Sequence, residues 1–258
     1  MQIYIGKDKM DMAQKAADFT AERMRKAIAD RGEARIIVAT GASQFEFLAA
    51  LVKEPGIDWT KVTGFHLDEY VGLPATHKAS FRAYMRERFV SKTPQPMKAF
   101  NEVNGESADP KAEIARLQGL IREAPIDVAC VGIGENGHLA FNDPPADFDT
   151  NDAYLVVDLD HKCRMQQVGE GWFATEDDVP KQAFSMSIKQ IMWAKSICCT
   201  CPDARKAEAV KGAIEGPVTN LLPSSILQMH PDCGMFLDPA SAASMKSAPF
   251  RSTWHHCL

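Results

Sequence analysis

Short continuous apolar runs alternate with longer amphipathic stretches along this 258-residue chain, and no other feature limits its fold as strongly. The runs at 35–41 (RIIVATG) and 127–133 (DVACVGI) are apolar at most positions, whereas residues 10–24 place apolar side chains three to five residues apart. A strand without a polar face is buried on both sides, as in a parallel sheet covered by crossover helices. The sequence therefore predicts an α/β fold: a three-layer, Rossmann-like, mostly parallel sheet with helices on both faces.

The expected elements follow this alternation along the whole chain. We expect strands at 3–5, 35–41, 62–70, 127–133, 154–158, 183–187, 196–201 and 234–237. Helices are expected from the cap at Asp8 to the stop at Gly32, from about 42 to 53, and at 81–89, 110–123, 203–213 and 239–245. No repeat, linker or low-complexity tract interrupts the pattern, so residues 1–258 are predicted to form a single domain.

The composition favours a small-molecule partner. The formal net charge is −5 and the Lys and Arg residues form no cluster, which argues against nucleic acid or an anionic membrane as the partner. No apolar stretch has the length of a membrane span, and the first residues lack a signal-peptide pattern, so a cytoplasmic location is expected. Most of the seven cysteines lie in apolar runs and are interpreted as reduced core thiols. No metal site is predicted, and His255, His256 and Cys257 are interpreted as a frayed tail.

The loop GIGENGHLAFNDPP at 132–145 permits two interpretations. Gly132, Gly134 and Gly137 match the G-x-G-x-x-G pattern in which a helix N-terminus binds a dinucleotide pyrophosphate. Only residues 138–142 precede the two prolines at 144–145, however, which leaves little more than one helical turn. A dinucleotide fingerprint also belongs to the first βα unit, whereas this loop follows a much later strand. We therefore interpret it as a catalytic loop.

The same loop is dense in groups that can hold or transfer a proton. Glu135, Asn136, His138, Asn142 and Asp143 all follow the carboxyl end of a buried strand, where ligands gather in open α/β sheets. Histidine changes its protonation near neutral pH, and close acidic neighbours favour a functional role for it. The structural alternative is a glycine turn with a surface histidine.

A second strand end carries two adjacent acids in FHLDEY. Side chains of an extended strand alternate between faces, so Asp68 and Glu69 cannot both point into one site. We expect one of them to be the catalytic acid. A solvated acidic turn is the alternative for this pair.

A third strand end is the stretch VATGASQ, in which Thr40, Gly41, Ala42 and Ser43 lie where a strand gives way to a helix. Free backbone N–H groups and the helix dipole attract phosphate at such a place. Plain helix capping is the alternative explanation.

Four stretches together resemble the glucosamine-6-phosphate deaminase (hexosamine-phosphate isomerase) family. They are ATGAS, FHLDEYVGLP, GIGENGHLAFNDP and KAEAVKGAIEGPVTNLLPSSILQMH, in this order over most of the chain. The related 6-phosphogluconolactonases have the same fold and a G-x-G-x-D-G-H loop, but typically continue with A-S-L-F-P where this chain has AFNDP. The resemblance implies a metal-free isomerisation of an aldose 6-phosphate to a ketose 6-phosphate, coupled to loss of ammonia and needing no cofactor.

The resemblance also implies roles for individual residues. Asp68 matches the carboxylate that moves a proton between carbons 2 and 1, and His138, flanked by Asn136 and Asp143, matches the ring-opening histidine. The expected substrate and phosphate contacts are Thr40, Gly41, Ala42, Ser43, Glu69, Gly134, Arg164 and Lys206, although an exposed structural arginine is an alternative for Arg164.

This chain departs from the family at several of these positions. The family usually has Asp at 136, Glu at 143 and Gly at 42, and its best-known members place a phosphate-contacting arginine within 169–172, here GEGW. An amide carries no charge, so either Asp143 or Glu135 orients His138 or the substrate differs. A sugar-phosphate lactonase and a catalytically inactive sugar-phosphate-binding protein stay as alternatives. The sequence leaves open which hexosamine epimer is used and whether the chain is a monomer or a homo-oligomer.

Overall fold

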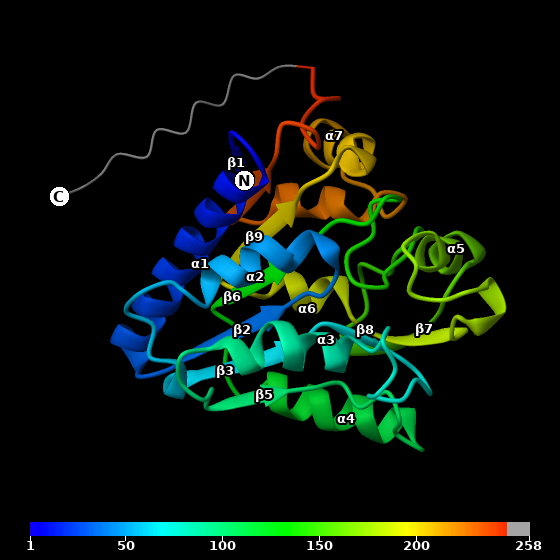
Figure 1. The fold of residues 1–258 in the computed structure, drawn as a ribbon, viewed down its shortest axis with the longest axis horizontal. Coiled ribbons are helices and arrows are strands. Elements are labelled where there is room, and N and C mark those ends of the chain that lie inside the picture. Colours follow the sequence, from blue (N-terminus) through cyan, green and yellow to red (C-terminus); the bar gives the residue numbers. More distant parts are fainter. Residues whose placement is uncertain (247–258) are drawn as a thin grey trace.

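The computed structural model describes residues 1–246, and these contain a seven-stranded parallel sheet at the centre of the molecule (Figure 1). The strand order is β1-β10-β9-β6-β2-β3-β5, and every neighbouring pair is parallel. The bounds are β1 (Gln2–Ile5), β2 (Ala34–Val38), β3 (Val62–His66), β5 (Ala99–Asn101), β6 (Val128–Val131), β9 (Ser196–Cys201) and β10 (Cys233–Leu237). The predicted α/β fold is confirmed.

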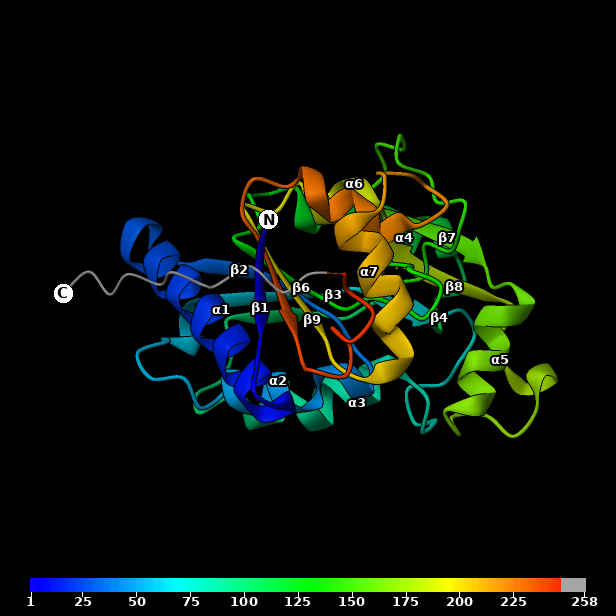
Figure 2. The ribbon, with the colours of Figure 1, turned by 90° about the horizontal axis from the view of Figure 1, so that it is seen from above.

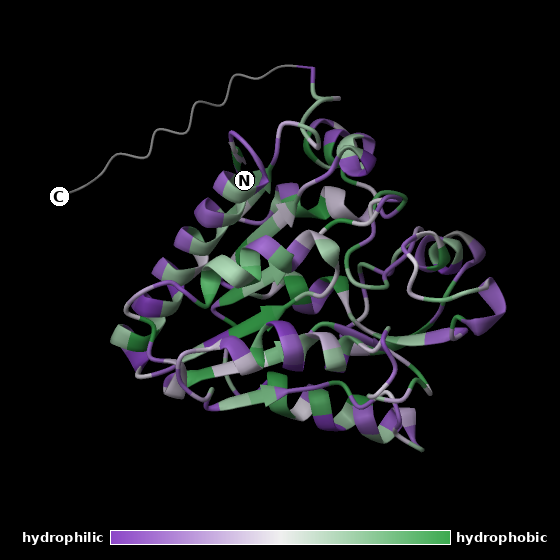
Figure 3. Cartoon of the chain, viewed as in Figure 1, coloured by the Kyte–Doolittle hydropathy of each residue, from purple (hydrophilic) through white to green (hydrophobic). Residues whose placement is uncertain are grey.

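Helices cover both faces of this sheet, as Figure 2 shows from above. The first face carries α1 (Lys9–Arg31), α2 (Phe45–Leu51) and α3 (Phe81–Arg88), and the second carries α4 (Pro110–Ile121), α6 (Ile188–Met192) and α7 (Ala207–Glu215). In β2, Ile36 and Val38 pack toward the first set while Ile37 packs toward the second. Figure 3 shows the consequence, apolar strands inside and helices with polar outer faces.

A second, three-stranded antiparallel sheet lies beside the first, with the order β4-β8-β7. Its strands are β4 (Asp68–Tyr70), β7 (Tyr154–Asp158) and β8 (Gln182–Met186), and α5 (His161–Gly169) packs against it through a small apolar cluster. The single strand predicted over 62–70 is therefore wrong. The chain leaves the large sheet at Leu67, whose carbonyl accepts a hydrogen bond from the Met186 N–H at 2.9 Å, and residues 68–70 then pair with β8.

Most predicted element positions agree with the structure. Asp8 caps α1 by accepting from the Asp11 N–H, and Gly32 ends it in the left-handed conformation at φ 81°. The helix predicted at 239–245 is wrong, because this segment forms turns. The sequence also missed β5, α5 and α6, three short elements whose local patterns are weak.

Cys130, Cys163, Cys198, Cys199, Cys201 and Cys233 are free and buried, as predicted. The tail residues His255, His256 and Cys257 lie outside the described residues. Among residues 1–246, no helix is both long and apolar enough to span a membrane.

Candidate active site

A cleft opens at the carboxyl ends of four neighbouring strands, β9, β6, β2 and β3. Its lining includes most of the residues singled out in the sequence: Thr40, Gly41, Ala42, Ser43, Asp68, Gly134, His138 and Lys206. These come from four stretches of chain up to 166 residues apart (40 to 206). Parallel strands bring their carboxyl ends to one edge, which explains why the motifs meet there.

The turn after β2 lines the cleft with residues 39–43 and has an unusual backbone conformation. Gly41 has φ 109°, a region that favours glycine, and Ala42–Gln44 form a single 3₁₀ turn before α2. Gln44 is buried and pairs with the end of β9, where the Thr200 hydroxyl donates to its Oε1 at 2.9 Å. The Tyr84 hydroxyl donates to the Gly41 carbonyl at 2.8 Å. No sequence motif indicated these two contacts, in which Gln44 ties the turn to β9 and Tyr84 ties it to α3.

The turn after β9 brings Lys206 into the cleft. Asp203 has φ 92°, which is rare for a residue with a side chain, and its N–H is held by the Asp238 carboxylate at 3.2 Å. The Asp203 carboxylate accepts a hydrogen bond from the Arg205 N–H. This contact caps the 3₁₀ turn Ala204–Lys206. Lys206 is 8% exposed and forms no ion pair with any residue in the described part of the chain. Its buried cation is available to an anionic ligand.

Asp68 begins β4, at the junction of the two sheets, and is 6% exposed. Burial raises the pKa of its carboxyl to about 8; the charge of Glu69 adds to this effect and the Thr40 hydroxyl opposes it. Its Oδ1 atom has no hydrogen-bond partner within residues 1–246. A carboxyl group with a pKa close to the working pH is suited to exchanging a proton with a ligand.

The glycines of the 132–138 loop make room for a histidine. A Cβ atom on Gly134 would lie 2.3 Å from Cε1 and Nε2 of His138, so only glycine allows the imidazole to lie against this backbone. Gly137 has φ 84°, and a Cβ there would meet the Leu222 side chain at 2.3 Å. Residues 139–142 form no helix. The structure therefore contradicts the dinucleotide-binding interpretation.

His138 is oriented by Asn136 and Asp143. Its Nδ1 atom lies 3.1 Å from Oδ1 of Asp143, and the same oxygen accepts a hydrogen bond from Nδ2 of Asn136 at 2.8 Å. The Asn136 Oδ1 atom in turn accepts from the His138 N–H at 3.1 Å. Burial alone would raise the pKa of Asp143, but the hydrogen bond and charge of His138, together with Asn136, lower it. Asp143, not Glu135, pairs with the imidazole.

The histidine loop and Asp68 share one support, Ser185 of β8. Asp68 stands opposite Ser185 in the β4–β8 register, and the Ser185 hydroxyl accepts from the N–H of Phe141 at 3.1 Å and from Nδ2 of Asn142 at 3.2 Å. Asn142 is buried and also donates to the Met186 carbonyl at 2.8 Å. The small sheet thus fixes the loop relative to the carboxyl group.

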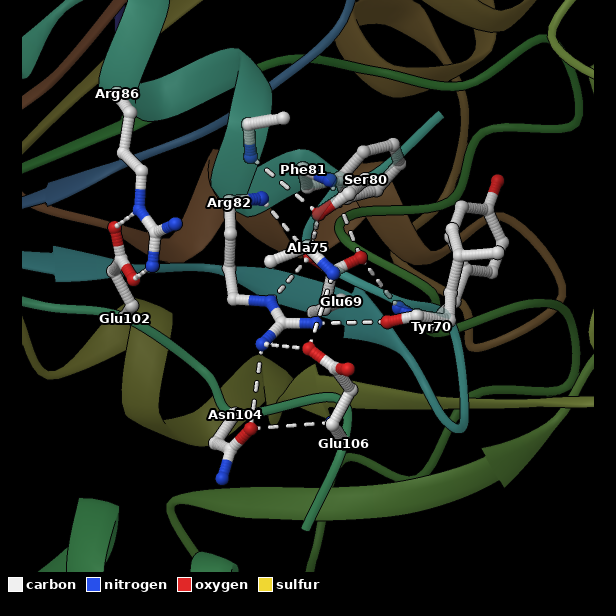
Figure 4. Close-up of polar contacts among 12 residues, drawn as sticks. Glu69, Tyr70, Ala75, Ser80, Phe81, Arg82, Arg86, Glu102, Asn104 and Glu106 are labelled. Atoms are coloured by element: carbon white, nitrogen blue, oxygen red, sulfur yellow. Dashed lines mark hydrogen bonds and ion pairs between the residues drawn. The ribbon is translucent and has the colours of Figure 1, made fainter. Parts of the chain in front are cut away.

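Glu69 does not contact the cleft, contrary to the expectation that it binds substrate. It is fully buried, and its carboxylate accepts from the Ser80 hydroxyl and from the backbone N–H groups of Tyr70, Phe81 and Arg82 (Figure 4). The Arg82 side chain lies 3.3 Å from Glu69 and 3.2 Å from Glu106. The carboxylate therefore stabilises the N-terminus of α3. It points away from Asp68 because neighbouring strand residues face opposite sides.

Arg164 also lies outside the cleft. It is on α5, and its guanidinium forms an ion pair with Oε1 of Glu176 at 2.5 Å, so the expected substrate contact is corrected. The side chain of Arg164 is 19% exposed, so it is not the exposed arginine of the structural alternative either. Among residues 1–246, no group of three or more His, Cys, Asp or Glu side chains is arranged to hold a metal ion.

The opposite side of the cleft comes from residues 78–81 and 166–172, and the second of these segments contains the GEGW stretch that departs from the family. Residues 78–81 precede and begin α3, and residues 166–172 end α5; the Lys78 ammonium donates to the Gly171 carbonyl at 3.1 Å. His77 stacks on Phe173 with ring centroids 5.3 Å apart. Lys78, Gln166, Glu170 and Trp172 line the cleft, and sequence reasoning did not find them as site residues.

A family model for glucosamine-6-phosphate isomerases and 6-phosphogluconolactonase matches residues 7–234 of this chain. The chain is 38% identical over 250 residues to the glucosamine-6-phosphate deaminase of Listeria innocua, covering 94% of this chain and 99% of that protein. It is 36% identical over 245 residues to the glucosamine-6-phosphate deaminase of Streptococcus equi subsp. equi, covering 95% and 100%.

Solved structures of other proteins superimpose on this fold. A monomeric glucosamine-6-phosphate deaminase superimposes with a TM-score of 0.85 at 28% identity, covering 95% of this chain and all of that one. The 6-phosphogluconolactonase of Thermotoga maritima superimposes with a TM-score of 0.72 at 15% identity, covering 92% and 99%. The second likeness concerns the fold alone.

Proposed function

Because the chain belongs to the family of glucosamine-6-phosphate isomerases and 6-phosphogluconolactonases, we propose that it is an enzyme of the deaminase branch. Its substrate is glucosamine 6-phosphate or an epimer such as galactosamine 6-phosphate, and its products are a ketose 6-phosphate and ammonia. The observation that carries the proposal is that a buried carboxyl group, an imidazole paired with a carboxylate behind it, and a buried lysine line one cleft through Asp68, His138 and Lys206.

His138 opens the sugar ring in this proposal. An imidazole can pass a proton to the ring oxygen and take one from the hydroxyl on carbon 1 near neutral pH. The contact between its Nδ1 and Asp143 supports the role, because it fixes the ring orientation and leaves Nε2 free for the substrate. Asn136 is a positioning residue that holds the Asp143 oxygen through a neutral donor.

Asp68 then moves the proton of carbon 2 to carbon 1. The carboxylate form removes the proton from carbon 2 of the open aldehyde, and the resulting enolamine receives it at carbon 1. Water adds to the imine carbon that this leaves at position 2, and ammonia departs. Acid–base assistance of this kind is worth roughly 10²- to 10⁴-fold in rate. The unpartnered Oδ1 atom and the raised pKa of Asp68 support this role.

The phosphate group binds between the turn after β2 and Lys206. Ser43, the backbone of Thr40 and Gly41, and the Lys206 ammonium line this end of the cleft. Holding the phosphate fixes the distance between the reacting carbons and Asp68, which is how a remote group contributes to the rate.

Incubation of the purified protein with each hexosamine 6-phosphate, followed by assays for ammonia and ketose 6-phosphate, tests the proposal. We expect equal amounts of both products from at least one epimer. A parallel reaction with 6-phosphogluconolactone tests the lactonase alternative. Hydrolysis of the lactone without ammonia release from either amino sugar would overturn the proposal, and binding of all substrates without turnover would favour the inactive binding protein.

A further inference from the structure

Lys78 is a cation in the cleft lining that no carboxylate contacts within the described part of the chain. It is exposed and lies three residues before α3. Its ammonium donates a hydrogen bond to the Gly171 carbonyl at 3.1 Å, and this acceptor is neutral. An ammonium group has three donors, so two of them are available to a ligand in the cleft.

The other cationic side chains of the lining differ in their partners. Lys9 and Arg205 each pair with a carboxylate, at 3.0 Å and 3.2 Å. Lys206 and Lys78 form no ion pair with any residue between positions 1 and 246. They come from separate segments, the turn after β9 and the stretch before α3. The cleft therefore has two lysines whose charge a ligand can use.

The segment of Lys78 is joined to the turn after β2. Tyr84 lies in the first turn of α3, and its hydroxyl donates to the Gly41 carbonyl at 2.8 Å. Tyr84 and residues 79–81 line the same cleft as residues 40–43. The N-terminal turn of α3 thus contacts the turn to which the proposed function assigns the phosphate group.

The acceptor of Lys78 is close to the turn after β9. Gly171 follows Glu170 in the chain. The pKa of Arg205 is raised mainly by its hydrogen bond to Asp203, and the charge of Glu170 adds to this effect. Residues 166–172 contain no lysine or arginine of their own. Lys78 is therefore the cation that this part of the lining receives from another segment.

We propose that Lys78 is a second phosphate-binding residue, whose ammonium binds the phosphate group of the ligand together with the ammonium of Lys206. The inference rests on the proposed function, which supplies a sugar 6-phosphate as ligand. A phosphate monoester carries a charge of roughly −1.5 to −2 at pH 7, so one lysine does not balance it. Lysine acts on phosphate as a point charge on a flexible stem, so Lys78 can meet a phosphate oxygen without a change of backbone. The site thereby selects doubly charged phosphate esters over singly charged esters of the same shape.

Two unreactive ligands isolate this selection from catalysis. Glucitol 6-phosphate and glucitol 6-sulfate have the same carbon chain, but the sulfate ester carries a single negative charge, and calorimetry at pH 7 gives both affinities. Lys78→Met should weaken binding of the phosphate about 10- to 100-fold, the range for a hydrogen bond between charged groups. Binding of the sulfate should weaken less, so the preference for the phosphate should fall at least about threefold.

Two further variants complete the experiment. Lys78→Arg keeps the charge and should retain the affinity for the phosphate within about fivefold, whereas a purely structural role of Lys78 predicts equal losses for the phosphate and the sulfate. Lys9→Met is the matched control. Lys9 also lines the cleft, but it pairs with Glu46, so its loss should leave both affinities within about threefold.

An unchanged affinity for glucitol 6-phosphate in Lys78→Met, equal losses for both ligands, or a wild type that binds neither ligand would overturn the inference, even if the wild type releases ammonia from a hexosamine 6-phosphate. A loss that is larger for the phosphate in Lys78→Met and absent in Lys9→Met would support it, even if no ammonia is released and the proposed reaction fails. The two proposals are therefore tested separately.

Discussion

The two sides of the cleft are built in different ways. On the strand-end side, formed by residues 39–43, 132–138 and 202–206, short turns directly follow strands whose backbones are hydrogen-bonded within the large sheet. On the outer side, formed by residues 78–81 and 166–172, the segments flank short helices outside the large sheet, and side-chain contacts such as Glu69–Arg82 and the Lys78–Gly171 hydrogen bond join them to their surroundings. Asp68 lies between the two sides, at the junction of the two sheets.

We expect the proposed reaction chemistry to depend mainly on the strand-end side. Groups that must face a reacting carbon within a fraction of an ångström are best held by rigid backbone. Segments held by side-chain contacts can change sequence without disturbing the large sheet. We therefore expect substitutions on the two sides to have different signatures.

Asp68→Asn should have the largest effect on activity. The amide cannot take up the proton of carbon 2, so kcat should fall roughly 10²- to 10⁴-fold while substrate affinity changes little. Steady-state kinetics with the active epimer measures this, with Asp158→Asn as the matched control, because Asp158 is exposed on β7. Wild-type kcat in Asp68→Asn would remove this residue from the mechanism.

Arg82→Met tests the support of the outer side. The Arg82 side chain is 6% exposed and its partner Glu69 is fully buried, so removing the cation leaves a buried charge and should cost about 3–5 kcal/mol of unfolding free energy. Arg86→Met is the matched control. Arg86 lies on the same helix as Arg82 and pairs with Glu102, but its side chain is 55% exposed (Figure 4). Its loss should cost at most about 1 kcal/mol. Equal costs in urea unfolding would contradict this contrast.

The pH dependence of kcat/KM should depend on Asp68. Catalysis needs the ionised carboxylate, so with a pKa raised to about 8 the rate should fall about tenfold per pH unit below that value. Glu69→Gln removes one cause of the raised pKa of Asp68. The acidic limb of the kcat/KM profile should therefore shift to lower pH. Both proteins are compared on one substrate, so the ionisation of the substrate affects the two pH profiles equally. A limb that does not move would show that Glu69 does not influence Asp68.

Asp68 also links stability to pH. Its folded pKa lies above the ordinary value of 3.8, so its neutral form stabilises the folded protein below about pH 4, and this contribution is lost as the pH rises through about 8. Asp68→Asn should therefore melt higher than the wild type at pH 8–9 and more nearly the same at pH 4. A melting-temperature difference that is independent of pH would contradict the raised pKa.

Gly134→Ala should have the smallest of these effects on the strand-end side. The new Cβ would force the His138 ring to move, and we expect kcat to fall about tenfold, less than the roughly 10²-fold that a 1 Å misplacement of a reacting group can cost. Gly119→Ala is the control, because a Cβ at Gly119 of α4 meets no neighbour within 4 Å and should leave kcat unchanged. Equal kcat values in both variants would mean that the Gly134–His138 contact is unimportant.

The sequence by itself determined the α/β class, most strands and helices, and the strand-end side of the cleft. Apolar runs predict buried strands because burial on both faces needs apolar residues at successive positions, and caps such as Asp8 and Gly32 act on their own neighbours. Alternation along FHLDEY correctly indicated that only one of Asp68 and Glu69 faces the cleft. The chemical roles of these residues stay predictions until they are tested.

Only the tertiary structure decided the rest. The β4–β8 register placed Asp68 opposite Ser185, the bend at Leu67 divided one predicted strand between two sheets, and α5 brought Glu170 to the cleft. Glu69 and Arg164 were assigned to the substrate from the resemblance, but their side chains have partners elsewhere. Such partners lie many residues away, and a local pattern records whether a side chain is buried but not which distant group it meets.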